Sequence, residues 1–204
     1  MFANNFPLPT AGPAAIATGA VGLLGLAFII LLFTIGQPFG TFNDICNGLA
    51  AVLSAVLAGM LYPKLHAQSP LFSQMTLAIA IFGAILALAG SYLAISGVSG
   101  WYLAGLYTLT GYALIGLWLL GLAYLALQIH SLPQGLAIFG LITGLILALG
   151  LVAIPGIFRA LDYNTYQVTT FNAIWWTSSL AYLTIYPAWC ILLGRLLLSG
   201  SAGE

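Results

Sequence analysis

Residues 14–35 read AAIATGAVGLLGLAFIILLFTI and contain no charged side chain. A helix rises about 1.5 Å per residue, so a run of this length reaches across the roughly 30 Å of hydrocarbon in a bilayer. Similar apolar runs, separated by polar or Gly- and Pro-containing breaks, recur at residues 41–61, 72–95, 101–128, 135–158 and 171–198. We therefore predict an all-α integral membrane protein, a bundle of about six transmembrane helices with short loops, in which residues 1–204 form a single transmembrane domain.

The composition independently points to a lipid environment. Of the 204 residues, 62% are hydrophobic and only 3% are charged, whereas about a quarter of the residues in a soluble domain are charged. Three basic and three acidic residues give a formal net charge of zero. Because the chain has no basic tract, nucleic acid is excluded as a partner, and membrane lipid is the expected surrounding.

The basic residues favour one orientation in the membrane. Six spans bring both termini to the same side, together with Lys64 and Arg195, whereas Arg159 falls on the other side. Basic residues concentrate in cytoplasmic segments of membrane proteins. We therefore expect a multi-pass protein of the cytoplasmic membrane with both termini in the cytoplasm, on the side called inner here.

Small residues recur about one helical turn apart in three of the expected spans. In lipid, helices associate through close packing and hydrogen bonds, so small residues mark the faces where they meet. The predicted packing seams are Ala51, Ala55 and Gly59; Gly83, Ala87 and Gly90; and Gly140, Gly144 and Ala148. Pro187 lies inside the sixth span and should kink it, because a proline cannot donate to the carbonyl of Leu183.

Aromatic residues gather near the expected ends of the spans. Their amphipathic rings favour the membrane interface. We expect an outer belt that includes Trp101, Tyr102, Trp175 and Trp176, and an inner position for Trp189.

The densest polar group is expected on the outer side and comprises Asn43, Asp44, Asn47, Arg159 and Asp162. Asn43 and Asn47 lie one turn apart on one helix face. Asp44 is expected in the first turn, where the helix dipole favours a carboxylate. We hypothesise that Asp44 and Asp162 share Arg159, which would tie the second span to the loop between the fifth and sixth spans.

This polar group has two interpretations. It is either a structural clamp or the lining of an outward-facing ligand site that extends to Tyr163 and Trp175. A charged pair near the interface can be solvated or packed without any ligand, which favours the clamp.

The chain carries no catalytic or cofactor signature. A Ser/His/Asp set, a Gly-rich phosphate loop and a CxxC pair are all missing from the sequence. His66 and His130 are the only histidines, and imidazole is a common ligand of haem and metals. Because no carboxylate is expected beside either, we predict no metal site, no cofactor and no enzymatic activity.

Three functions remain open from the sequence. The leading hypothesis is a non-catalytic protein that acts by helix packing, as an accessory subunit of other membrane proteins or as a self-associating scaffold. The alternative is a small-molecule binding or transport protein with a polar site around Asp44 and Arg159. The third is a pigment- or haem-binding subunit that uses His66 or His130.

The length and the number of spans add one resemblance to the second of these functions. In both respects the chain resembles the small substrate-binding subunits of vitamin uptake systems, which are also six-helix membrane proteins. This resemblance implies the binding of a small molecule within the bundle.

Overall fold

The computed structural model describes residues 10–161 and 169–201. Within them the chain is all-helical, and six helical stretches are long and apolar enough to cross a membrane. The helices are α1 (Ala11–Thr34), α2 (Phe39–His66), α3 (Pro70–Ser96), α4 (Trp101–Gln128), α5 (Gln134–Ala148), the 3-10 helix η2 (Leu149–Ala153), α6 (Ile154–Phe158), α7 (Thr169–Leu183) and α8 (Ile185–Ser201). The fifth span joins α5, η2 and α6, and the sixth joins α7 and α8.

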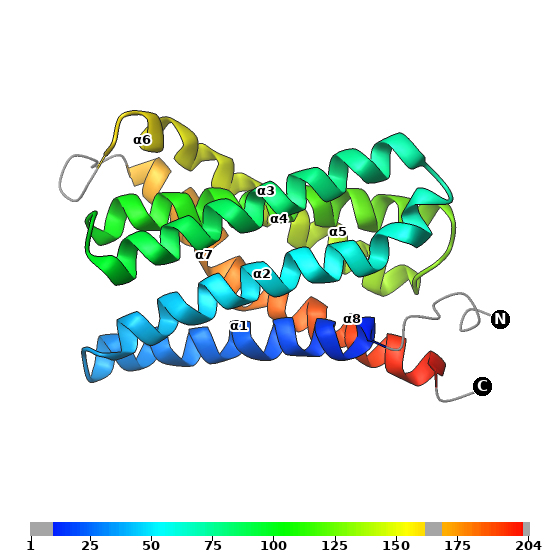
Figure 1. The fold of residues 1–204 in the computed structure, drawn as a ribbon, viewed down its shortest axis with the longest axis horizontal. Helices are drawn as coiled ribbons and strands as arrows, with labels where there is room; N and C mark the ends of the chain where they lie inside the picture. Colours follow the sequence, from blue (N-terminus) through cyan, green and yellow to red (C-terminus); the bar gives the residue numbers. More distant parts are fainter. Residues whose placement is uncertain (1–9, 162–168, 202–204) are drawn as a thin grey trace.

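The spans run back and forth along one long axis (Figure 1). Helix α1 begins and α8 ends at the same end of the bundle, which we call the terminal end; the opposite end is the distal end. Helices that follow one another in the chain pack side by side from α1 to α5, and α8 closes the bundle against α1. Helix α4 is the most deeply buried span. Of its most apolar stretch of 18 residues, 72% is buried inside the protein, so α4 forms the centre of the bundle.

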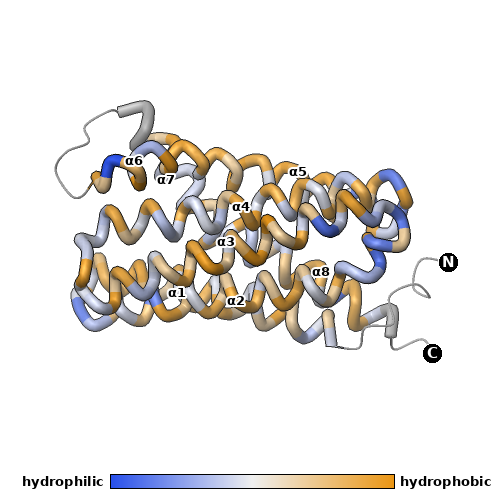
Figure 2. The backbone as a smooth tube through the Cα atoms, turned by 45° about the horizontal axis from the view of Figure 1, so that its top comes forward, coloured by the Kyte–Doolittle hydropathy of each residue, from blue (hydrophilic) through white to orange (hydrophobic). Residues whose placement is uncertain are grey.

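Apolar residues cover most of the length of the helices, and hydrophilic residues gather mainly at the turns (Figure 2). Many large side chains of α1 and α3 are exposed, among them Phe33, Met75, Phe82 and Ile85. Such a surface is stable only against lipid. The protein is therefore a multi-pass helical membrane protein, as predicted.

Most helix limits agree closely with the predicted spans. The fourth span, predicted at residues 101–128, is α4 itself. The second span continues to His66, beyond its predicted end at residue 61, because Pro63 does not interrupt α2. This proline leaves only the carbonyl of Gly59 without its helical donor, and Gly59 is exposed close to the helix end.

The last two spans are both interrupted. The break in the sixth span confirms the kink predicted at Pro187: α7 ends at Leu183 and α8 begins at Ile185. The break in the fifth span was not predicted. There the helix tightens into η2 just before Pro155, which cannot donate to the carbonyl of Leu151.

Candidate functional site

Two asparagines tie α2 to α1 inside the bundle. Asn43 and Asn47 are buried on one face of α2. The Asn43 side-chain amide donates to the backbone carbonyl of Gly25 at 2.9 Å, and the Asn47 amide donates to Asn43 Oδ1 at 3.0 Å. Gly25 lets the two helices approach, because a Cβ there would lie 3.3 Å from Cys46 Cβ. These amides are thus satisfied by the protein itself.

Three tyrosines extend this polar region through the centre of the bundle. The Tyr112 hydroxyl donates to the backbone carbonyl of Asn47 at 2.8 Å. Its ring stacks on Tyr182, with centroids 4.5 Å apart and planes at 12°. The Tyr186 hydroxyl donates to Ser54 Oγ at 2.7 Å. We call Asn43, Asn47, Ser54, Tyr112, Tyr182 and Tyr186 the core polar row.

The core polar row fixes the relative positions of α1, α2, α4, α7 and α8. Hydrogen bonds between transmembrane helices contribute about 0.6 kcal/mol each on average. Their main effect here is to set the register, since a buried amide or hydroxyl without a partner costs more than the bond gains. The sequence pattern identified the two asparagines but not the three tyrosines. Tyrosines were expected at the ends of the spans, near the membrane interface, whereas these three lie in the middle of their spans.

Asp44 lies beside this row, partly buried. Because α2 begins at Phe39, Asp44 falls in the second turn of the helix and not in the first turn, as was predicted. The effect of the helix dipole falls off within the first turn, so it supports this carboxylate less than expected. Within the described residues, Asp44 makes no hydrogen bond or ion pair.

Asp44 and Arg159, the two described members of the predicted clamp, form no ion pair with each other in the structure. Arg159 is exposed directly after α6. At the distal end, α6 and the turn between α1 and α2 lie at opposite edges of the bundle (Figure 1). The helices α2 and α6 do not touch. The fifth span packs on α4, α7 and α8 instead. Asp162 and Tyr163 lie outside the described residues.

The two histidines do not come together with other metal ligands. The Tyr62 hydroxyl and His66 Nδ1 are 2.8 Å apart, one turn along α2. His130 is exposed in the turn before α5, with a left-handed backbone. In residues 10–161 and 169–201, no group of three His, Cys, Asp or Glu side chains is placed to hold a metal ion.

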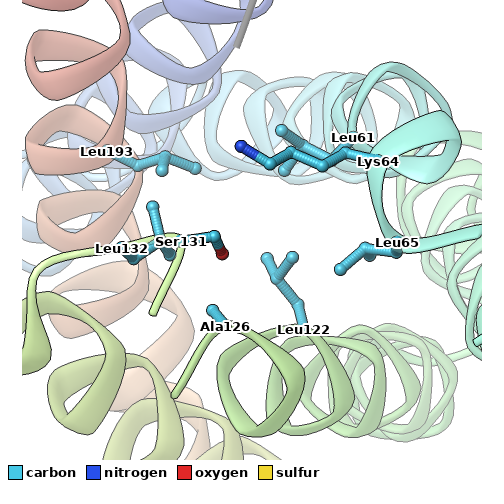
Figure 3. Close-up of a pocket in the computed structure, with 8 residues that line it drawn as sticks. All are labelled: Leu61, Lys64, Leu65, Leu122, Ala126, Ser131, Leu132 and Leu193. Carbon is cyan, nitrogen blue, oxygen red and sulfur yellow. The ribbon is translucent and has the colours of Figure 1, made fainter. Parts of the chain in front are cut away.

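A small cavity lies at the terminal end between α2, α4, α8 and the turn before α5 (Figure 3). Its volume is about 10 Å³, which is room for roughly one water molecule. Lys64 and Ser131 direct their polar atoms toward it, and the rest of its lining is apolar: Leu61, Leu65, Leu122, Ala126, Leu132 and Leu193. A metabolite does not fit in a cavity of this size.

Aromatic residues cluster at the distal end. Trp175 packs against Trp101, Tyr102 and Trp176, with ring centroids 6.2, 5.9 and 4.8 Å away. Trp101 and Trp176 are exposed as an interfacial belt requires, but Tyr102 and Trp175 are buried. Trp189, expected at the inner interface, is fully buried within the bundle, and its Nε1 donates to the carbonyl of Leu136 at 3.1 Å.

Helix α3 meets α4 along the glycines proposed for its seam. A Cβ on Gly83 would lie 2.6 Å from the Gly111 carbonyl oxygen, and one on Gly90 would lie 2.6 Å from Thr108 N. Ala87, between them, is fully buried. The backbones of the two helices are therefore in direct contact.

The other two predicted seams have different outcomes. On the fifth span, Gly140 meets Trp189 and Gly144 meets Gly116, while Ala148 is half-buried. On α2, Ala51 is buried and Ala55 half-buried. Gly59 was wrongly placed on a seam, since it is exposed and an added Cβ would meet nothing within 4 Å.

One glycine seam was missed by the sequence reasoning. Gly12, Gly19 and Gly22 of α1 face α8, where Cβ atoms would meet Leu198, Ile191 and Pro187. The spacing of these glycines along one face of the first span carried the signal. The seam brings the kinked sixth span into direct contact with α1.

No protein-family model, curated protein or solved structure matches this chain.

Proposed function

We propose that the protein is a non-catalytic membrane protein that acts by helix packing, as an accessory subunit of a larger membrane assembly or as a self-associating scaffold. The observation that carries this proposal is the shortness of the described connections. They span residues 35–38, 67–69, 97–100 and 129–133. Connections of this size are too short to form a binding domain outside the membrane, which supports contact with a protein partner through the sides of the helices within the bilayer.

Helix α3 offers an exposed apolar face for such a contact. Met75, Phe82, Ile85 and Tyr92 follow one another at helical spacing, and each is more than half exposed. The opposite face of α3 is occupied by the glycine contact with α4. A rigid stripe with two aromatic side chains suits packing against another transmembrane helix better than the aliphatic face of α5 does.

Native mass spectrometry of the protein extracted with its surrounding lipid tests this function. We expect assemblies heavier than the single chain of 21.4 kDa. The double variant Phe82→Ala/Ile85→Ala should release the single chain, whereas the control Ile142→Ala/Leu145→Ala on α5, which trims similarly exposed side chains, should not. A single chain in every preparation, or equal loss with both variants, would contradict the proposal.

A second candidate function is small-molecule binding or transport at Asp44. It is favoured by the carboxylate itself, because ionisable residues within membrane spans are costly and commonly mark ligand or ion pathways. A thermal-unfolding screen against neutral, anionic and cationic metabolites tests it. At least one compound should raise the melting temperature of the wild-type protein and fail to do so for Asp44→Asn; no such compound in the panel would count against the function.

We also propose that the terminal end faces the cytoplasm. Lys64 and Arg195 lie toward that end and Arg159 lies at the distal end, which agrees with the usual excess of basic residues in the cytoplasm. A reporter fused after Glu204 that is active only in the cytoplasm should be active. Activity of a reporter that requires export would reverse the orientation.

A further inference from the structure

The Asp44 carboxylate lacks a fixed counter-charge in the described part of the protein. Five residues separate it from the start of α2, so it lies about 8 Å along the helix from that end. Lys64, on the same helix, is twenty residues further on, or about 30 Å away. Arg159 is exposed directly after α6, a helix that does not touch α2. A partly buried carboxylate at this depth favours a bound positive charge.

A second polar group points at the same face of α2. Ser91 of α3 is buried, 3% exposed, and its Oγ has no hydrogen-bond partner among the described residues. By contrast, the buried hydroxyls of Ser54 and Ser73 each donate to the carbonyl four residues earlier. Ser91 Oγ lies 3.2 Å from the position of a Cβ on Gly48. Gly48 is one turn from Asp44 on the same face of α2.

A third oxygen comes from α7. Tyr182 stacks on Tyr112, and the Tyr112 hydroxyl is held on the carbonyl of Asn47, less than one turn from Asp44. This contact places the Tyr182 ring beside α2, although the backbones of α2 and α7 do not touch. Within the described residues, the Tyr182 hydroxyl makes no hydrogen bond.

We propose that Asp44, Ser91 and Tyr182, from three different helices, bind one monovalent cation, either Na⁺ or a small primary ammonium. A carboxylate and two hydroxyls form an all-oxygen set, which hard cations prefer over softer ligands. A single carboxylate balances one positive charge. This inference rests on the second candidate function and is independent of the proposed subunit role.

Thermal unfolding of the purified protein in detergent tests the site with two probes, sodium chloride and methylammonium chloride. The bulky cation N-methyl-D-glucamine keeps the ionic strength constant. We expect at least one probe to raise the melting temperature of the wild-type protein in a saturable way. Asp44→Asn should abolish this rise, and Ser91→Ala should increase the half-saturating concentration at least tenfold. Ser96→Ala, at an exposed serine of the same helix, is the matched control and should leave it unchanged.

The outcomes distinguish a cation site from a site for neutral or anionic ligands. A wild-type melting temperature that responds to neither probe overturns the proposal, and so does an equal response in Asp44→Asn. If the Asp44→Asn protein does not accumulate, the comparison of Ser91→Ala with Ser96→Ala tests the proposal. Equal half-saturating cation concentrations in these two variants would then overturn the cation site. A neutral or anionic compound that stabilises through Asp44, without any response to cations, would refute the cation site and leave the second candidate function standing.

Discussion

Replacing Gly111 by alanine should destabilise the bundle strongly, because this glycine sits where α3 and α4 touch. A Cβ there would lie 2.5 Å from the Gly83 carbonyl oxygen and would also collide with the backbone nitrogen of Ala87. Backbone atoms cannot rotate away as a side chain can. The helices must separate instead, which also loosens the buried Ala87.

The magnitude follows from two opposing effects. Overpacking a close contact costs about 1–3 kcal/mol, and contact with backbone on both sides places Gly111→Ala near the upper value. Alanine gains about 0.5–1 kcal/mol over glycine within a helix. The expected net loss is therefore about 2 kcal/mol, or close to thirtyfold in the unfolding equilibrium constant.

Gly59→Ala is the matched control. Gly59 also lies within a helix, but a Cβ there meets nothing within 4 Å. Only the helix-propensity gain remains, so this variant should be neutral or stabilised by up to about 1 kcal/mol. Reversible unfolding in detergent micelles with added SDS, followed by the fluorescence of the five tryptophans, measures both. Equal free energies of unfolding for Gly111→Ala and Gly59→Ala would refute the direct backbone contact as the source of stability.

Three further predictions concern buried groups. Tyr112→Phe should lower the free energy of unfolding by about 0.6–1.7 kcal/mol through loss of its interhelical hydrogen bond, whereas Tyr107→Phe, on a half-buried residue of the same helix, should change it little. Ser178→Ala should lower the free energy of unfolding by about 1–3 kcal/mol in the same SDS titration, because the Ser178 hydroxyl donates at 3.0 Å to the carbonyl of Leu147, at the start of the break in the fifth span. An unchanged SDS midpoint would show that this hydrogen bond does not stabilise the bundle. Cys46 and Cys190 are both buried free thiols, so a maleimide should label them only after SDS unfolding, and rapid labelling of the folded protein would show that the bundle opens.

The spans could be predicted because length and hydropathy report directly on a lipid environment. The predicted and observed fourth spans coincide at residues 101–128. The kink at Pro187 was also predictable, because proline has no backbone N–H to donate, whatever surrounds it. The break at η2 was not, because it depends on a neighbour as well as on Pro155: the Ser178 hydroxyl, from another span, donates to the carbonyl of Leu147.

The packing faces were only partly predictable. Small-residue spacing led to Gly83 and Gly90, which meet α4, but it also led to Gly59, which meets nothing. The spacing describes one helix at a time, and whether a partner lies opposite depends on the order of the helices in the bundle. The pairing of Asp44 with Arg159 failed for the same reason. Both were expected at one side of the membrane, yet they belong to elements at opposite edges of that side.

The central position of α4 has a consequence for how the chain is made. Helix α3 leaves the ribosome before α4, so the face that carries Gly83 and Gly90 has no partner until synthesis has passed residue 128. During that interval three spans lie in the membrane with their tightest contact surface turned toward lipid. Helices α1, α2 and α3 can already pack on one another at this stage, whereas the contacts of α3 and α5 with α4 can form only after the fourth span has been inserted.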